Sequence, residues 1–308
     1  MSTHARPALS VGLPTFGTAA ARHGHDWRHL LDLARMAEDA GVDRLVVSDH
    51  VVLGPNTAGY PWGTFPTGPE ADWLEPLTVV AALAAVTTSV RFLTGVLVAP
   101  LRPAALLAKT AATVDVLSDG RLDLGVGTGW QPEEFTAVGA SFADRGRLLT
   151  EGLAACRQLW TGGPVAVGHG PEATTVWCAP VPRQVPLPVW FSGTLTARNV
   201  RRITELGDGW IPIMGTDAAG LADGVRVLRA AFADAGRDAA TLGVRAALAT
   251  VRDAGGRADV DRTLAGAPDL LLAGATDVHV SLRAFDPSGE RPADTFARLV
   301  ARYRAETA

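Results

Sequence analysis

The sequence predicts an α/β fold of the (β/α)8 type, a TIM barrel, and two observations support this prediction. Short apolar runs rich in β-branched residues alternate with helical patterns along the chain, which is typical of βα units and a parallel sheet. The length of 308 residues also suits an α/β barrel. The same units could wind into an open sheet, but their near-even spacing and the lack of any pattern for a second domain favour closure. We therefore expect one barrel domain over residues 1–308.

The first two βα units have clear boundaries. The first apolar run ends at Pro14, and the helix after it begins near Asp26 and stops at Gly41. The second strand is followed by residues 51–72, which are too rich in Gly and Pro for regular structure. Loops of this length in compact domains are usually functional, so we expect residues 51–72 to form a lid.

The middle of the chain follows the same alternation. Pro76 begins the next helix, because proline suits the first helical position. Residues 161–187 interrupt the alternation with several prolines, and we interpret them as an insertion that contains a hairpin. Helices are expected at 132–138 and 144–160, before this insertion. The eight expected strands are 9–13, 44–48, 90–98, 121–126, 188–192, 210–214, 242–250 and 277–282.

Composition narrows the class of ligand. The chain is 47% hydrophobic and 19% charged, with a net charge of −4 and scattered basic residues. This pattern disfavours nucleic acid or an anionic membrane as a partner and favours a small-molecule substrate. No leader pattern and no apolar run of about 18 residues occurs, so a cytoplasmic location is expected. The spacing of Cys156 and Cys178 suggests neither a disulfide framework nor a metal site.

In a barrel of this kind the active site lies at the C-terminal ends of the strands. His50 is placed there next to Asp49, and imidazole is well suited to proton exchange near neutral pH. The alternative is that both residues merely cap the strand. The other residues that directly follow apolar runs include Thr15, Phe16 and Met214.

Two further strand ends are suited to a cofactor. The glycine-rich segment 125–130 lets the backbone approach a flat ring or a phosphate, although it lacks a dinucleotide fingerprint. Ser192, Gly193 and Thr194 precede a helix that begins near Thr196, and free amides at a helix N-terminus favour phosphate. An ordinary helix cap is the alternative interpretation of this second segment.

Three segments together resemble the luciferase-like monooxygenase superfamily, in particular its branch of coenzyme F-420 (deazaflavin) dependent oxidoreductases. They are AEDAGVDRLVVSDH at 37–50, TGVLVAPLRPAALLAKTAATVDVLSDGRLDLGVGTGWQPEEF at 94–135 and PVWFSGTLTARNVRRITELGDGWIPI at 188–213. The resemblance implies the same barrel with a deazaflavin or flavin in its mouth. It also implies a homodimer as one arrangement, because family members often pair through helices beside strands two and three.

The resemblance assigns roles to individual residues. It implies a cis peptide bond between Gly95 and Val96 against the back of the cofactor ring, and it places His50 near the reactive ring carbon. The remaining cofactor-binding residues that it implies are Gly127, Thr128 and Gly129 beside the ring and Ser192, Gly193 and Thr194 around the phosphate.

The expected reaction is hydride transfer between F-420 and a small organic substrate held beneath the lid. His50, assisted by Asp49, would exchange a proton, and the apolar walls would come from Phe16, Trp62, Trp73, Trp130 and Met214. These walls could equally be core or loop anchors. The alternatives are an oxygen-using monooxygenase dependent on reduced FMN and a non-catalytic relative that binds a ligand without turnover. The sugar-phosphate dehydrogenase reaction of this family is disfavoured, because Gly54 and Trp130 stand where those enzymes carry tryptophan and glutamate.

Overall fold

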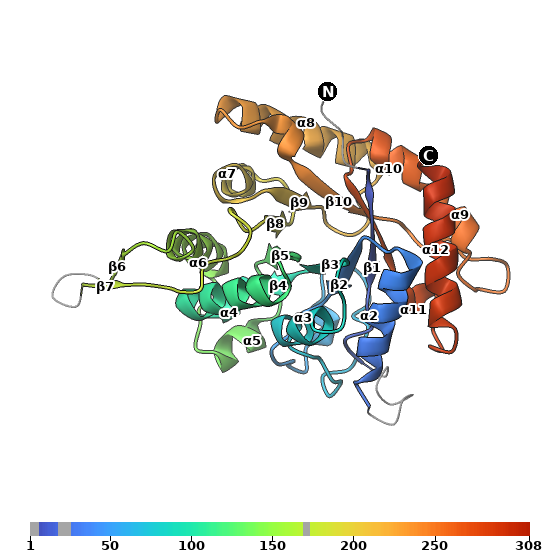
Figure 1. The fold of residues 1–308 in the computed structure, drawn as a ribbon, viewed down its shortest axis with the longest axis horizontal. Helices are drawn as coiled ribbons and strands as arrows, with labels where there is room; N and C mark the ends of the chain where they lie inside the picture. The colour runs from blue at the N-terminus through green and yellow to red at the C-terminus, as the bar shows by residue number, and fades with distance from the viewer. Residues whose placement is uncertain (1–5, 18–25, 169–172) are drawn as a thin grey trace.

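A computed structural model of the chain describes residues 6–17, 26–168 and 173–308. Its centre is a closed parallel barrel, shown with its surrounding helices in Figure 1. The sheet order is β3-β2-β1-β11-β10-β9-β8-β5-β4, and β3 also pairs with β5, which closes the ring. The predicted (β/α)8 fold is therefore confirmed. The barrel strands are β1 (Ala8–Gly12), β2 (Arg44–Val47), β3 (Arg91–Thr94), β4 (Leu97–Val98), β5 (Leu122–Gly127), β8 (Val189–Ser192), β9 (Gly209–Ile211), β10 (Gly243–Ala247) and β11 (Asp277–Ser281).

Helices surround the barrel, and local sequence explains several of their ends. Glu75 caps α3 by accepting the Thr78 N–H at 2.7 Å, and Pro76 is the first helical residue. Gly41 ends α2 with a φ of 85°, which glycine adopts readily. The helices are α2 (His29–Ala40), α3 (Pro76–Ala84), α4 (Ala104–Leu117), α5 (Pro132–Ala137), α6 (Arg145–Leu159), α7 (Ala197–Leu206), α8 (Ala218–Asp234), α9 (Val260–Leu264), α10 (Ala267–Leu272), α11 (Leu282–Phe285) and α12 (Pro292–Glu306).

The expected third strand is interrupted. Residues 90–98 were expected to be continuous, but β3 and β4 are separated by Gly95 and Val96. The peptide bond between these two residues is cis, as the resemblance implies. β3 pairs with β2 and β5, whereas β4 pairs with β5 alone, so the backbone leaves the ladder at this point.

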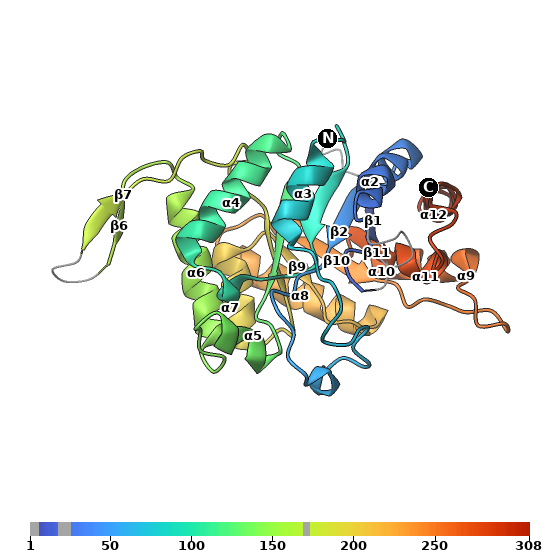
Figure 2. The ribbon, with the colours of Figure 1, turned by 90° about the horizontal axis from the view of Figure 1, so that it is seen from below.

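The insertion contains the expected hairpin. β6 (Val165–Val167) and β7 (Thr174–Val176) pair antiparallel, and residues 169–172 of the insertion lie outside the described residues. Figures 1 and 2 show this hairpin projecting away from the barrel. No helix in the described part of the chain is long and apolar enough to cross a membrane.

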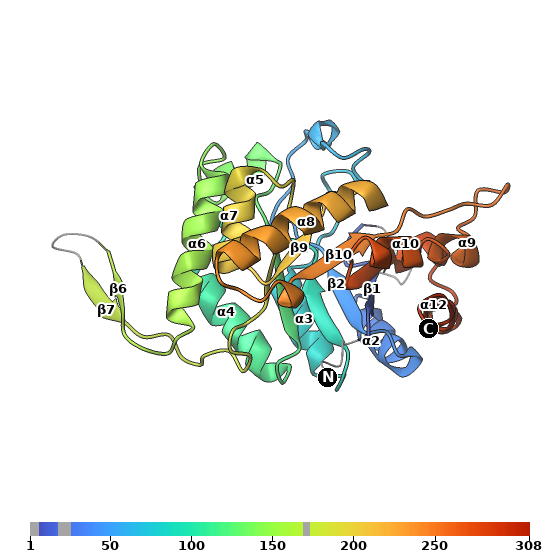
Figure 3. The same cartoon turned by 90° about the horizontal axis from the view of Figure 1, so that it is seen from above.

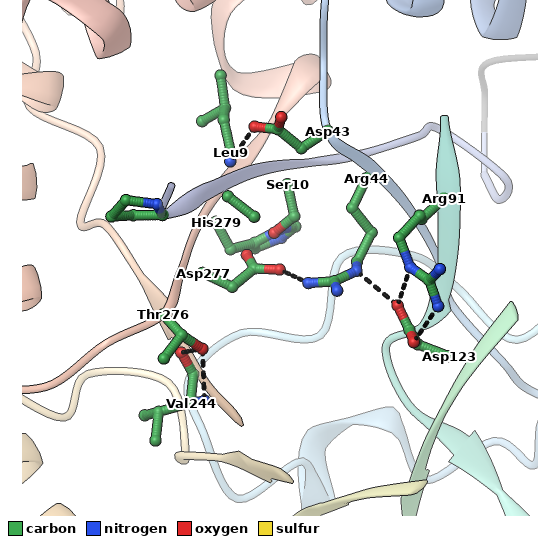
Figure 4. A network of polar contacts seen from close by, with 12 residues as sticks. Leu9, Ser10, Asp43, Arg44, Arg91, Asp123, Val244, Thr276, Asp277 and His279 are labelled. Atoms are coloured by element: carbon green, nitrogen blue, oxygen red, sulfur yellow. Dashed lines mark hydrogen bonds and ion pairs between the residues drawn. The ribbon is translucent and has the colours of Figure 1, made fainter. Parts of the chain in front are cut away.

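The interior of the barrel has a charged layer at the N-terminal ends of the strands, which we call the floor and define as Arg44, Arg91, Asp123 and Asp277. Arg44 donates to Asp123 at 2.9 Å and also to Asp277. Arg91 donates to both oxygens of Asp123, at 3.1 and 2.7 Å. Figure 4 shows this network. Above it lies a small apolar cluster of Val46, Leu93, Trp190 and Ile211.

Candidate active site

His50 lies just beyond the C-terminal end of β2, and Glu134 from α5 holds its ring. Oε2 of Glu134 lies 3.1 Å from Nδ1 of His50, while Oε1 accepts the backbone N–H of Val51 at 3.0 Å. His50 is 9% exposed and Glu134 is fully buried. When Glu134 is ionised it can only accept, so Nδ1 carries the proton and Nε2 is left to exchange one. The pair is therefore built like a general acid or base with its orienting group.

Asp49, which was expected to assist His50, makes its side-chain hydrogen bonds with other residues. Its carboxylate accepts the backbone N–H of Val98 at 2.8 Å and two hydrogen bonds from Arg102, at 2.7 and 3.0 Å. Desolvation acts to lower the pKa of Arg102, but the bonds and charge of Asp49 and Glu75 raise it above its usual value. Asp49 thus anchors β4 next to the interruption of the strand, and its partner is Arg102 because a buried carboxylate needs charge compensation.

Aromatic side chains surround His50. The ring centroids of Trp73 and Phe65 lie 4.5 and 5.3 Å from that of His50, both edge to face. Phe16 stacks on Trp73 at 4.1 Å, and Trp130 contacts Phe65 at 5.2 Å. We call His50, Phe16, Tyr60, Phe65, Trp73 and Trp130 the aromatic cluster. It brings together three of the predicted pocket residues.

The other two predicted wall residues lie at the margin. Trp62 is 42% exposed and contacts Tyr60 at a centroid distance of 5.4 Å, so it extends the aromatic cluster outward. Met214 follows β9 and is 60% exposed. Neither touches the ring of His50.

Residues 51–72, the segment that was expected to be a lid and for which we keep that name, are hydrogen-bonded to other parts of the chain near both ends. Near its start, Gln131 accepts the backbone N–H of Gly54 at 2.9 Å and donates to the Gly54 carbonyl at 3.3 Å. Near its end, Gly17 donates to the Asp72 carbonyl at 2.8 Å, and Leu74 donates to the Thr15 carbonyl at 3.1 Å. Figures 2 and 3 show the lid in light blue on the side of the barrel where α5 lies.

Glycines at the ends of β3 and β5 form a shelf next to β2, the strand that His50 follows. A Cβ on Gly127 would lie 2.8 Å from Cγ2 of Val96, and a Cβ on Gly129 would lie 2.7 Å from Cγ1 of Val98. Gly129 also has a φ of 76°, which disfavours other residues. We define this shelf as Gly95, Val96, Gly127, Thr128 and Gly129. These are the predicted residues at the ends of β3 and β5, and the structure brings them together.

Ser192, Gly193 and Thr194 end β8 and lead to the N-terminus of α7. Thr196 caps this helix by accepting the Asn199 N–H at 3.3 Å, while Nδ2 of Asn199 donates to the Thr194 carbonyl at 3.1 Å. Arg202, one turn further, donates to Thr150 at 2.9 Å rather than to a carboxylate. An adjoining cavity of about 320 Å³ is lined by residues that include Gly193, Thr194 and Trp210. The segment therefore has the amides and hydroxyls that suit an anionic group, while Arg202 also donates to Asn199 and to the Gly146 carbonyl.

The site residues follow strands that are neighbours around the barrel. His50 follows β2, the shelf belongs to β3, β4 and β5, and Ser192 ends β8, which pairs with β5. A larger cavity of about 530 Å³ lies between α2 and α11 in the described part of the molecule, but none of the predicted site residues lines it. The continuous array from His50 to Thr194 is thus the better candidate for a ligand with a ring and a phosphate tail.

Unpaired polar atoms support the fit of such a ligand. Thr15 Oγ1, Trp130 Nε1 and two nitrogens of Arg245 are buried and have no hydrogen-bond partner among the described residues. Buried polar groups are normally satisfied, so these atoms are positioned to be completed by a bound polar group.

Sequence reasoning missed four residues of this region. Glu134 is the partner of His50, and its only signal was an acidic residue beside Phe135 in a short helix. Tyr60 and Phe65 lay in a lid that has no periodicity to reveal contacts. Arg245 gave a clearer signal, because it is a lone charge inside an otherwise apolar run.

Comparisons with known proteins agree with this architecture. The family described as luciferase-like monooxygenase matches residues 9–269. An uncharacterised protein of Mycobacterium tuberculosis is 32% identical over 214 residues, which cover 67% of this chain and 74% of that protein.

Two solved structures share the fold. A monooxygenase of Streptomyces bottropensis has a TM-score of 0.78 at 20% identity, with 98% of this chain and 100% of that chain covered. The F-420-dependent tetrahydromethanopterin reductase of Methanopyrus kandleri has a TM-score of 0.70 at 16% identity, with 99% and 100% covered.

Proposed function

Because the chain belongs to the luciferase-like monooxygenase family, we propose that it is an oxidoreductase that uses coenzyme F-420 to transfer a hydride to or from a small organic substrate. The family includes oxidoreductases and monooxygenases, so membership supports redox chemistry. The use of F-420 as the cofactor is what we propose. The observation that carries the proposal is the ring of His50, held by Glu134 beneath the lid.

When bound, the deazaflavin would supply or accept the hydride. The residues that would hold it are the shelf for the ring and Ser192, Gly193 and Thr194 for the phosphate. Glycines at the shelf let its backbone pack closely against Val96 and Val98. The amides at the start of α7 suit an anion.

His50 handles the proton that accompanies hydride transfer. Glu134 keeps Nδ1 protonated, so Nε2 gives a proton to the substrate or takes one from it. Substrates whose conversion moves one hydride and one proton fit this arrangement.

The aromatic cluster would exclude water and select the substrate. Trp73 and Phe65 pack edge to face with the His50 ring, and Phe16 stacks on Trp73. A small and largely apolar substrate suits these walls, because few polar atoms are available there.

The second candidate is a monooxygenase that uses reduced FMN and oxygen. The structural match to the Streptomyces monooxygenase favours it, and the phosphate-binding segment suits either cofactor tail. A non-catalytic relative that binds a ligand without turnover is the third candidate.

Cofactor titration separates these candidates. We expect the quenching of F-420 fluorescence to report binding at micromolar concentrations, followed by anaerobic turnover of reduced F-420 with an accepting substrate. Turnover only with reduced FMN and oxygen would replace the proposal with the second candidate. Binding of neither F-420 nor FMN at tens of micromolar would exclude both enzymes.

The role of His50 is tested separately. His50→Ala should lower turnover by about 100-fold, which is the low end of what a general acid or base contributes. His29→Ala, at the start of α2, is the matched control and should retain activity. An unchanged rate in His50→Ala, with cofactor affinity intact, would remove His50 from the mechanism.

A further inference from the structure

Arg245 reaches from the middle of β10 to the layer of the shelf. Its Nη1 and Nη2 lie 3.0 and 3.7 Å from the position that a Cβ on Gly95 would take. Gly95 directly follows β3 and begins the interruption before β4. The guanidinium therefore lies against the backbone of the shelf, while Arg245 is the register partner of Asp277 in the floor.

Two nitrogens of this cation lack hydrogen-bond partners among the described residues. Arg245 is 8% exposed, and its Nε and Nη1 have no hydrogen-bond partner in the described part of the chain. A guanidinium carries five N–H donors, so leaving two of its nitrogens unsatisfied is costly. Buried charges in proteins are normally paired or bound to a ligand.

The neighbouring charges compensate it only in part, because Asp277 acts on it without forming an ion pair. The floor contains Arg44 and Arg91 against Asp123 and Asp277, so its two positive and two negative charges balance. No ion pair within 4.0 Å joins Arg245 to a carboxylate among the described residues. Arg245 therefore adds one positive charge to the barrel interior. Burial lowers its pKa to about 10, with Asp277 opposing and Arg44 adding to this effect, so the group stays charged near neutral pH.

His279 lies beside this charge without adding to it. Its Cε1 lies 3.2 Å from the position of a Cβ on Gly12, and its Nδ1 lies 3.2 Å from Oγ of Ser10. Burial and the charge of Arg245 place the pKa of His279 well below its usual value. The imidazole of His279 is therefore neutral near pH 7, and Arg245 carries the positive charge next to the shelf.

We propose that Arg245 binds the negatively charged ring of the reduced cofactor and thereby favours the reduced over the oxidised form. This inference rests on the proposed function. A dihydroflavin or dihydrodeazaflavin ring becomes anionic by loss of the N1 proton, and the charge is shared by N1 and the C2 oxygen. A planar guanidinium beneath the shelf is suited to such a planar pair of acceptors. Charge near N1 is one of the ways in which a protein tunes a flavin.

The competing explanation is structural. Oδ1 of Asp277 also lacks a partner, so Arg245 could serve only to offset the charge of this aspartate within the barrel. The two explanations differ in what removal of the cation does to the protein without cofactor, and this difference can be measured.

The first experiment compares dissociation constants for oxidised and reduced cofactor, with F-420 and FMN each measured by fluorescence or absorbance under anaerobic conditions. In Arg245→Gln, affinity for the reduced form should fall about 10- to 1,000-fold more than affinity for the oxidised form, because an opposite charge shifts a pKa by about 1 to 3 units. The midpoint potential of the bound cofactor should fall by about 30 to 90 mV, at 29.6 mV per tenfold change for two electrons. Arg245→Lys should retain part of the preference because it keeps the charge.

The second experiment measures thermal unfolding without cofactor. Arg245→Met should raise Tm, by about 2 to 4 °C, because it removes a buried cation without a partner. Arg91→Met is the matched control, since it leaves Asp123 with one partner fewer, and its Tm should fall.

The outcomes separate the two levels of the proposal. Failure of the wild-type protein to bind either F-420 or FMN would overturn the proposed function and this inference with it. Wild-type binding together with an unchanged preference in Arg245→Gln would overturn the inference alone. A fall in Tm for Arg245→Met as large as that for Arg91→Met would support the structural explanation instead.

Discussion

At the floor of the barrel Arg44 and Arg91 share two carboxylates, whereas at the shelf Arg245 has none (Figure 4 shows the floor). Both regions lie inside the same ring of strands and both are largely buried. The charges of the floor are therefore paired with one another, although Oδ1 of Asp277 lacks a hydrogen bond among the described residues, whereas two nitrogens of Arg245 have no partner there. In barrels of this type the N-terminal face serves stability and the C-terminal face serves function. In this protein the charged side chains near the N-terminal face are paired with one another, whereas Arg245, which reaches towards the C-terminal face, forms no ion pair with a described carboxylate.

The largest effect should come from breaking the floor. Asp123→Ala removes the carboxylate that Arg44 and Arg91 share and leaves both cations underpaired. We expect the free energy of unfolding in urea to fall by about 3 to 5 kcal/mol, as for other broken buried pairs. Cofactor affinity of the folded fraction should stay unchanged. A loss of affinity without a loss of stability would contradict the division between floor and mouth.

The next effect should be on catalysis alone. In Glu134→Gln an amide replaces the carboxylate, so Nδ1 is no longer held as a donor and His50 loses the form that leaves Nε2 free. Turnover should fall by about 100-fold while stability changes little. The double variant His50→Ala/Glu134→Gln should be no slower than His50→Ala, because the two residues act as one unit. Additive losses in the double variant would show that Glu134 acts independently of His50.

A smaller effect on stability is expected at the shelf. Gly129→Ala places a side chain at a φ of 76° and 2.7 Å from Cγ1 of Val98. The left-handed backbone alone costs about 1 to 2 kcal/mol. Gly139→Ala is the matched control, since Gly139 has a φ of 71° and open space around its Cβ position. Both variants should lose stability, but only Gly129→Ala should also lose cofactor affinity.

The smallest effect concerns pH and a single carboxylate at the N-terminal side of the barrel. Burial opposes ionisation of Glu38, but hydrogen bonds from the backbone of Ser89, Val90 and Thr88 lower its pKa from 4.5 to about 2. Its contribution to stability is therefore complete above about pH 4.5 and is lost as the pH falls towards 2.

Glu38→Gln should remove this part of the acid sensitivity. Unfolding of both proteins in urea at stepped pH should show a wild-type excess of less than about 1 kcal/mol above pH 4.5, since the carboxylate is only partly buried and is screened. The excess should shrink as the pH falls. An excess that persists at pH 2 would show that the hydrogen bonds do not depend on charge.

The sequence was sufficient for the fold because its signals are local. Periodic apolar runs, Gly41 and Pro76 mark strands and helix ends without knowledge of the rest of the chain. The break between β3 and β4 has no such local signal, since residues 90–98 read as one apolar run. The cis bond there could be anticipated only from the resemblance.

The candidate site was predictable in position but not in pairing. Strand ends identify His50 and Ser192 directly, because every parallel strand presents its C-terminal end at the same face. The partner of His50 lies 84 residues away in α5, and adjacency in the sequence suggested Asp49 instead. Side-chain pairing across the barrel depends on three-dimensional contacts that no periodicity encodes.

The attachment of the lid has a consequence for engineering. Gln131 holds the lid at Gly54, and Thr15 and Gly17 hold the chain at Leu74 and Asp72. Residues 55–71 lie between these anchors and carry Tyr60 and Phe65, so exchanging them changes the aromatic walls around His50, whereas Glu134 and its contact with His50 lie outside the exchanged segment. Grafting lids of different length and aromatic content between the same two anchors would vary the substrate while leaving the proton-handling pair in place.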